Sequence, residues 1–218
     1  MDCTKLSPRL ALVAQMVREG VRLTDVGTDH AYLPVFLLHT GKIVSAIAAD
    51  VRVGPLENAK MTIDENNFSH LVQTRLSDGL EKISADETDD IVFAGMGGEL
   101  IVKLMENCPW VKNGEKHFVF QPMTHSEKLR SYLFENGFAI NNEKAVKDSG
   151  KIYVVFDAFY DGKVRQKSDG YYYVGELDLT LEESKEFIKQ TIRHLKNKLK
   201  AGENKHLETC IEEMEKMI

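Results

Sequence analysis

The segment 25–30, with the sequence DVGTDH, has the residue types of a nucleotide-binding loop. It follows a β-like run and leads into a helical one, where a glycine lets a ligand approach the backbone and helix amide groups face that ligand. Gly27 is the single glycine of the loop, and Asp29 stands where a dinucleotide-binding loop has glycine. Its carboxylate would repel a pyrophosphate and attract a cation such as a sulfonium. The loop therefore predicts a positively charged nucleotide ligand.

Further carboxylates follow the next two β-like runs. Asp50 comes about 20 residues after the loop, at the spacing where an acidic residue accepts hydrogen bonds from both ribose hydroxyls. Asp78 follows the third run in Ser77-Asp78-Gly79, where a carboxylate can accept the adenine amino group. Each aspartate alone also suits a helix cap or a turn. Their order and spacing together predict a site for an adenosine with a positive sulfur, as in S-adenosylmethionine.

A glycine-rich stretch, Gly95-Met96-Gly97-Gly98, follows the fourth β-like run and opens a helix. This is the carboxyl edge of the sheet, where ligands bind in folds of this kind. A tight turn with positive φ would account for one of these glycines more readily than for three. The stretch therefore predicts close approach of a substrate to the backbone.

Hydrophobic periodicity predicts the elements that hold these residues. An amphipathic helix is expected at 6–17, where apolar residues recur at helical spacing. Strands are then expected at 21–26, 43–49, 71–75, 90–94 and 117–121. Helices are expected at 32–39, 55–66, 99–107 and 126–136. This alternation is typical of an α/β fold with a mostly parallel sheet.

The pattern changes after Gly137. Two β-like runs, 139–146 and 152–159, flank a turn-prone segment and predict an antiparallel hairpin at the sheet edge. Apolar residues at a/d spacing then predict two helices on either side of 201–204, packed as a coiled-coil-like hairpin within one chain. We therefore expect a ligand-binding domain at 1–165 and a C-terminal helical hairpin at 166–218, in a monomer.

Composition narrows the class of protein. A chain of 218 residues suffices for one α/β domain with an appendage, and no signal peptide or membrane span is evident, which predicts a cytoplasmic protein. Cys3, Cys108 and Cys210 have no paired spacing, so neither disulfides nor a metal site are expected.

The net charge of −6 disfavours nucleic-acid binding, but segment 185–205 has six lysines and one arginine against two glutamates. Alone, this segment suits a solvated helix face.

Four motifs together resemble a known family. They are Leu6-Ser7-Pro8-Arg9-Leu10, the run DVGTDHAYLP at 25–34, the glycine-rich stretch 95–98, and Gln121-Pro122. They are similar to the bacterial tRNA (adenine-N1)-methyltransferase family TrmK, which modifies position twenty-two of tRNA. The resemblance covers nearly the whole chain and implies a class I Rossmann-like methyltransferase sheet, S-adenosylmethionine as cofactor and tRNA as partner. One departure is Met123, because the family often has asparagine after Gln-Pro.

Motifs and resemblance together define the expected site. The residues expected to bind the cofactor are Asp25, Gly27, Asp29, His30, Asp50, Asp78, Gly79, Gly95, Met96 and Gly97. Those expected to bind the substrate are Arg9, Gly98, Lys189, Arg193 and Lys196, with Arg18 and Arg22 as further phosphate contacts. No metal is expected.

Asp29 is the expected catalytic residue. Methylation of adenine N1 leaves positive charge on the ring, and a carboxylate hydrogen-bonded to the exocyclic amino group stabilises the transition state more than the ground state. His30 either orients Asp29 or packs. Because pairing and stacking hide the base edges, we expect the adenine to be extruded and stacked on Tyr32 or Phe120.

Two other functions remain to be weighed. The chain could be a catalytically inactive methyltransferase-like module that binds RNA or protein through its helical hairpin. The complete series of nucleotide-site residues argues against this. An NAD-dependent enzyme is disfavoured by the single-glycine loop.

Overall fold

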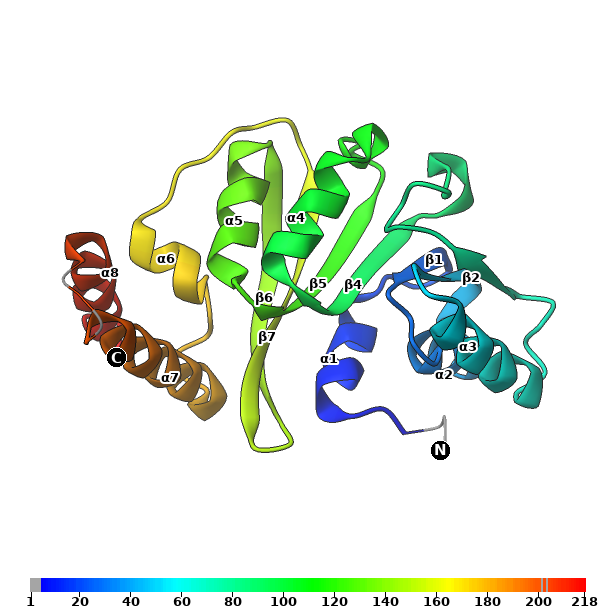
Figure 1. The fold of residues 1–218 in the computed structure, drawn as a ribbon, viewed down its shortest axis with the longest axis horizontal. Coiled ribbons are helices and arrows are strands. Elements are labelled where there is room, and N and C mark those ends of the chain that lie inside the picture. The colour runs from blue at the N-terminus through cyan, green and yellow to red at the C-terminus, as the bar shows by residue number, and fades with distance from the viewer. Residues whose placement is uncertain (1–4, 201, 203) are drawn as a thin grey trace.

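The structure is a computed structural model that describes residues 5–200, 202 and 204–218. In this part of the chain a seven-stranded sheet has the order β3-β2-β1-β4-β5-β7-β6 (Figure 1). β1 to β5 are parallel, whereas β7 is antiparallel to both β5 and β6. The strands are β1 (Val21–Val26), β2 (Ile43–Asp50), β3 (Val72–Leu76), β4 (Asp90–Gly97), β5 (His117–Thr124), β6 (Phe138–Asp148) and β7 (Lys151–Tyr160). The predicted α/β fold with an antiparallel hairpin at its edge is confirmed.

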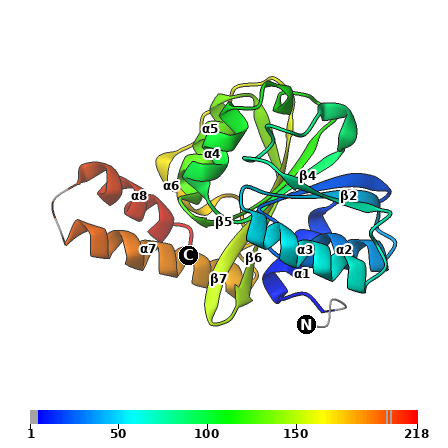
Figure 2. The same ribbon diagram turned by 45° about the vertical axis from the view of Figure 1, so that its right-hand side comes forward.

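Helices cover both faces of the sheet (Figure 2). The helices on one face are α1 (Pro8–Met16), α2 (Tyr32–His39) and α3 (Val53–Glu65), and those on the other are α4 (Gly98–Glu106) and α5 (Ser126–Glu135). Because side chains alternate along a strand, Ile91 and Phe93 of β4 pack with α4 and α5, and Val92 packs with the opposite helices. The 3-10 turns Ala85–Glu87 and Pro109–Val111 lie in connections. Helix α3 begins before Pro55, since proline is tolerated in a first helical turn.

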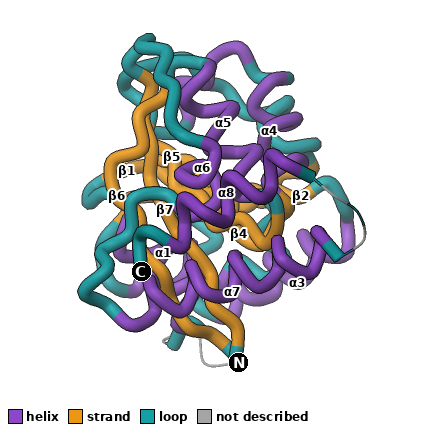
Figure 3. The backbone as a smooth tube through the Cα atoms, turned by 90° about the vertical axis from the view of Figure 1, so that its left-hand side faces the viewer, coloured by secondary structure: helices purple, strands orange, loops and turns teal. Residues whose placement is uncertain are grey.

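Three C-terminal helices form a separate hydrophobic cluster. They are α6 (Asp169–Val174), α7 (Glu182–Leu199) and α8 (Lys205–Glu215), and α7 packs against β6 and β7 (Figure 3). The predicted helical hairpin is therefore confirmed. Residues 201 and 203 of its connection lie outside the described residues, as does Cys3. Helix α6 was not predicted, and Ser168 caps it by accepting a hydrogen bond from the Tyr171 amide.

A buried ion pair attaches these helices to the sheet. The Arg130 guanidinium donates to Glu143 at 2.7 Å and also to the carbonyl oxygens of Tyr172 and Tyr173. Glu143 in turn accepts a hydrogen bond from the Glu176 amide at 2.6 Å. Because both charged side chains are almost fully buried, loss of one would leave the other uncompensated, at a cost of about 3–5 kcal/mol. The pair therefore joins α5, β6 and the segment around α6.

A second buried network lies at the amino-terminal ends of β4 and β5. The His117 imidazole lies 3.0 Å from Asp90 and 3.1 Å from Asp157, and it is buried. Burial disfavours its charged form, but the hydrogen bonds to Asp157 and Asp90 outweigh this and raise the pKa of His117 to about 9. The ring is therefore positively charged at neutral pH and bridges the central strands.

Arg18 and Arg22 belong to this same end of the sheet. Arg18 donates to Asp90 at 2.7 Å and Arg22 to Asp89 at 2.7 Å, so both guanidinium groups are paired with carboxylates. Ligands bind at the opposite, carboxyl end of parallel strands. The expectation that these arginines hold a substrate beside the ligand loop is therefore wrong.

The charged His117 network predicts a pH-dependent stability. The pKa of His117 is higher in the folded state than its ordinary 6.5, so its contribution is complete below pH 6.5 and is lost as pH rises through about 9. The free energy of unfolding should fall by on the order of 2 kcal/mol across that interval. Urea titrations at several pH values should show this fall in the wild type and in the exposed control His70→Gln, and not in His117→Gln. An identical pH profile in His117→Gln and the wild type would contradict the assignment.

Candidate active site

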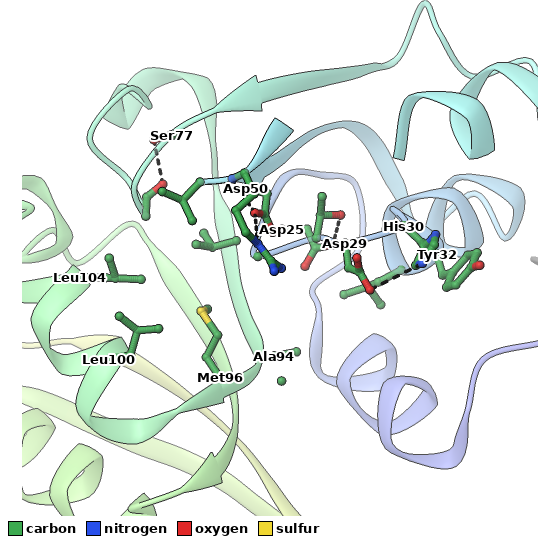
Figure 4. Close-up of a pocket in the computed structure, with 18 of the residues that line it drawn as sticks. Asp25, Asp29, His30, Tyr32, Asp50, Ser77, Ala94, Met96, Leu100 and Leu104 are labelled. Carbon is green, nitrogen blue, oxygen red and sulfur yellow. Dashed lines mark hydrogen bonds and ion pairs between the residues drawn. The ribbon is translucent and has the colours of Figure 1, made fainter. Parts of the chain in front are cut away.

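A cavity of about 660 Å³ lies at the carboxyl ends of β1, β2 and β4 (Figure 4). Such an edge is where open α/β sheets bind ligands, since the strand order reverses between β1 and β4. The expected residues that line the cavity are Arg9, Asp25, Gly27, Asp29, His30, Asp50, Asp78, Gly79, Gly95 and Met96. The fold thus brings together five segments that are far apart in the sequence.

Two carboxylates of the cavity are buried. Asp25 and Asp50 end neighbouring strands, and each is 6% exposed. The Thr28 hydroxyl donates to Asp25 at 2.6 Å, and the Arg52 amide donates to Asp50 at 2.8 Å. Burial and, to a smaller extent, the neighbouring charge of Asp50 together raise the pKa of Asp25 to about 6, against the opposing effect of the Thr28 hydrogen bond. Two acidic groups held so close favour a cationic ligand that donates hydrogen bonds.

The backbone between β1 and α2 is tightly turned. Gly27, Asp29 and Ala31 all have positive φ, at 77°, 51° and 54°. This conformation is unfavourable for alanine, and such strain is concentrated at functional sites. Met96 lies over Gly27, where an added Cβ atom would come within 3.4 Å of the Met96 sulfur. The turns therefore bring backbone and the Met96 thioether close to the ligand position.

Asp29 differs from the buried aspartates. Its side chain is 62% exposed although it lines the cavity, and its carboxylate lies 3.6 Å from the His30 imidazole. The His30 ring stacks on Tyr32, with centroids 5.0 Å apart and planes 8° from parallel. Figure 4 shows the three side chains on the same side of the cavity. Asp29 is thus exposed to solvent as well as to the cavity, whereas Asp25 and Asp50 are buried in the cavity wall.

A buried glutamine organises the glycine-rich loop. The Gln121 side-chain oxygen accepts a hydrogen bond from the Gly95 amide at 3.1 Å and another from the Arg9 guanidinium. Gln121 is fully buried, and Arg9 also lies over the Tyr153 ring at 5.7 Å. The Gln121-Pro122 motif belongs to the family resemblance, but the sequence did not predict Gln121 as a site residue. Its contacts depend on helix α1 meeting the end of β5, which no local pattern reveals.

Several expected residues lie elsewhere. Gly97 and Gly98 do not line the cavity. An added Cβ atom on Gly98 would lie 2.2 Å from the His125 carbonyl oxygen. Because glycine has no such atom, α4 can pack on the turn before α5. Phe120 is fully buried between Phe93 and Phe118, so the expectation that it stacks on a substrate is wrong. The expected residues Lys189, Arg193 and Lys196 are exposed on α7.

The part of the chain that the structure describes offers neither a metal cluster nor a membrane-spanning helix. Histidine, cysteine and acidic side chains in this part of the chain form no cluster of three or more that could hold a metal ion. Among the described helices, none is both long and apolar enough to cross a bilayer.

Comparison with known proteins identifies the family. Residues 6–156 match the family model described as a methyltransferase domain. The tRNA (adenine(22)-N(1))-methyltransferase of Bacillus subtilis is 35% identical over 169 residues, which are 74% of this chain and 71% of that protein. The crystal structure of B. subtilis TrmK, the M1A22 tRNA methyltransferase, superposes with a TM-score of 0.79 at 29% identity, over 98% of this chain and 96% of that one. The chain belongs to the TrmK family.

A further relative bears on the cofactor. A Streptococcus pneumoniae protein, solved in complex with S-adenosyl-L-methionine, has a TM-score of 0.85 and 30% identity, and the match covers 97% of this chain and 99% of that chain. The fold of a relative that binds S-adenosyl-L-methionine is thus present over nearly the full length of this chain, C-terminal helices included.

The buried Asp50 carboxylate generates a test of cofactor binding. If Asp50 accepts hydrogen bonds from the ribose hydroxyls, Asp50→Ala should weaken binding of S-adenosylhomocysteine at least about tenfold, because hydrogen bonds to a charged group contribute about 1.5–3 kcal/mol. Titration calorimetry measures this, with Asp86→Ala as a control at an exposed aspartate outside the cavity. A folded Asp50→Ala protein with wild-type affinity would remove Asp50 from the site.

Proposed function

We propose that this protein is an S-adenosylmethionine-dependent methyltransferase that methylates N1 of adenine 22 in tRNA. The observation that carries the proposal is a cavity in which acidic residues end successive parallel strands, with an exposed aspartate in its lining. The named activity of the B. subtilis relatives supports the same reaction. A tRNA-modifying enzyme acts in the cytoplasm, and a monomer suffices because one chain contains both the cavity and the basic helix.

The residues present fit S-adenosylmethionine. Asp50 would hold the ribose, Asp78 the adenine amino group, and the backbone around Gly27 the part of the cofactor nearest the sulfur. The negative charges of Asp25 and Asp50 match a ligand with a positive sulfonium, and a pyrophosphate would be repelled. When bound, this cofactor supplies a methyl group already activated for transfer.

The chemistry demands little of the protein beyond geometry. Adenine N1 has a free lone pair, so no nucleophilic side chain and no strong base are needed, and in-line placement is the main contribution. Asp29 would accept a hydrogen bond from the exocyclic amino group and stabilise the positive charge that develops on the ring. Its exposure beside the cavity leaves it free for such a contact.

The side chains next to Asp29 give the extruded base a surface. Tyr32 stacks on His30 and lines the cavity, so an aromatic face is available where the adenine would enter. We assign His30 to orienting the Asp29 carboxylate, from which it is 3.6 Å away. Gly97 and Gly98 would act through the shape of the loop, since neither lines the cavity.

The C-terminal helical hairpin, within 166–218, would hold the tRNA backbone. Lys189, Arg193 and Lys196 follow one another at helical spacing, so they share one face of α7, and all three are exposed. Lys196 also forms an ion pair with Glu215 of α8 at 2.5 Å, which a phosphate would have to displace or share. Contacts between such residues and phosphates make binding strongly salt-dependent. Arg9 lines the cavity and would contribute a further contact at its opening.

The catalytic role of Asp29 predicts a selective loss of turnover. Asp29→Asn should lower the single-turnover rate at least about tenfold, and removal of one transition-state contact can cost about 10²–10³. S-adenosylhomocysteine affinity should change little, because Asp29 is exposed and the cofactor is held mainly by buried groups. Quench-flow methylation of a tRNA transcript measures the rate, with Asp86→Asn as control. Wild-type single-turnover rates in Asp29→Asn would exclude the role.

The role of α7 predicts a change in salt dependence. A triple Lys189→Ala, Arg193→Ala, Lys196→Ala variant should bind tRNA more weakly and with a shallower dependence of log affinity on log salt, by about 0.7–0.9 per lost phosphate contact. Cofactor affinity should stay unchanged. The matched control replaces three exposed lysines elsewhere, Lys60, Lys82 and Lys163, by alanine. Equal salt slopes in the two triple variants would mean that α7 is structural.

A further inference from the structure

A smaller cavity of about 210 Å³ lies between β5, β7 and α7. We call it the β7–α7 groove, and its lining residues are Pro122, Met123, Thr124, Ser126, Lys151, Ile152, Tyr153, Val154, Phe187 and Gln190. Its volume is below the roughly 300–1,000 Å³ that encloses a whole small-molecule ligand. It therefore suits one ring system, with the remainder of the ligand outside.

The groove shares a wall with the active site. Arg9 lines the active-site cavity, and its guanidinium lies 5.7 Å from the centre of the Tyr153 ring, which lines the groove. Gln121 accepts a hydrogen bond from Arg9, and its amide nitrogen lies 3.6 Å from the sulfur of Met123 in the groove. The two cavities are thus separated by little more than the side chains of Arg9 and Gln121.

The groove has the chemistry of a base-stacking site with a cationic rim. Tyr153 and Phe187 are half-buried aromatic side chains, and Met123 is 41% exposed. Lys151 is exposed at one rim, and Lys189 is exposed on α7 next to Gln190. Aromatic faces beside lysines are the combination with which proteins hold unpaired nucleotides.

We propose that the β7–α7 groove binds the base of a nucleotide adjacent to the target adenine in the same RNA strand, with that base on Tyr153 and its phosphate on Lys151. The proposal rests on the proposed tRNA methyltransferase activity. An adenine held in the active site brings its neighbours to the shared wall, because the RNA strand is continuous. The groove then leads that strand toward the basic face of α7.

Met123 acquires a role in this arrangement. It lies where the family often has asparagine, and it lines the groove and not the active-site cavity. Its thioether gives the neighbouring base an apolar contact surface, so this departure alters recognition of the neighbour and leaves the geometry at the target adenine intact.

The test compares three substitutions in the full chain. Tyr153→Leu removes the aromatic face, Tyr153→Phe keeps it, and Lys151→Ala removes the charge at the rim. Lys60→Ala is the matched control, since Lys60 is an exposed lysine on α3 that lines neither cavity. Single-turnover methylation at varied concentrations of a tRNA transcript, repeated at several salt concentrations, gives the half-saturating tRNA concentration, its salt dependence and the maximal rate. Calorimetry with S-adenosylhomocysteine reports on the active-site cavity.

We expect Tyr153→Leu to raise the half-saturating tRNA concentration at least about fivefold, the lower bound of what a stacked base contributes. Tyr153→Phe should behave as the wild type. Lys151→Ala should reduce the slope of log affinity against log salt by about 0.7, which one phosphate of a single strand contributes. S-adenosylhomocysteine affinity should be unchanged in all variants, as should every reading for Lys60→Ala.

Failure of the proposed function and failure of the groove's role give different results. If the wild type does not methylate tRNA, the proposed function and the groove's role both fall. If the wild type is active but Tyr153→Leu and Lys151→Ala match Lys60→Ala, the groove does not bind the strand and the proposed function stands. A loss of cofactor affinity in Tyr153→Leu would also overturn the proposal, because Tyr153 would then act through Arg9 on the active-site cavity.

Discussion

The carboxylates of Asp25 and Asp50 are removed from water at the ends of neighbouring strands, and two like charges in such a place are costly unless a cation or hydrogen-bond donors compensate them. Thr28 and the Arg52 amide supply one donor each, and the largely exposed Arg52 guanidinium lies 3.6 Å from Asp50. The parallel order of β1 and β2 makes the proximity unavoidable, because both strands end at the same edge. The cavity is consequently selective by charge, and a sulfonium nucleoside satisfies it where a dinucleotide would not.

The backbone around these carboxylates is constrained in a related way. Gly79 has a φ of 55°, and an added Cβ atom would lie 2.7 Å from Leu104, so the turn after β3 closes onto α4 only with glycine. Gly95 has a φ of 84° and is held through its amide by Gln121. These turns and the strained loop after β1 hold Asp29 with its side chain 62% exposed, and so open to a substrate. Rigid turns of this kind hold a site within the small tolerances that catalysis by positioning needs.

Much of this arrangement could be predicted from the sequence, and the failures have a common cause. Strand and helix positions follow from hydrophobic periodicity, and the acidic strand ends follow from spacing. The predictions for Phe120 and Arg18 were wrong, and the packing of Gly98 was not predicted, because a residue's surroundings depend on which distant segment packs against it. Phe120 is enclosed by aromatic neighbours, Arg18 meets Asp90, and Gly98 accommodates the His125 carbonyl group. The contact of Arg9 with Gln121 is equally long-range, and so it was missed.

The most direct test of the account is methyl transfer to tRNA with the product mapped. The purified protein is incubated with S-adenosylmethionine and an unmodified tRNA transcript that has adenine at position 22, and the methylated atom and position are identified by mass spectrometry and reverse-transcription stops. The account predicts 1-methyladenine at position 22, and none in a transcript with guanine there. Transfer to another base or another atom, or no transfer by a folded protein that binds S-adenosylhomocysteine, would contradict it.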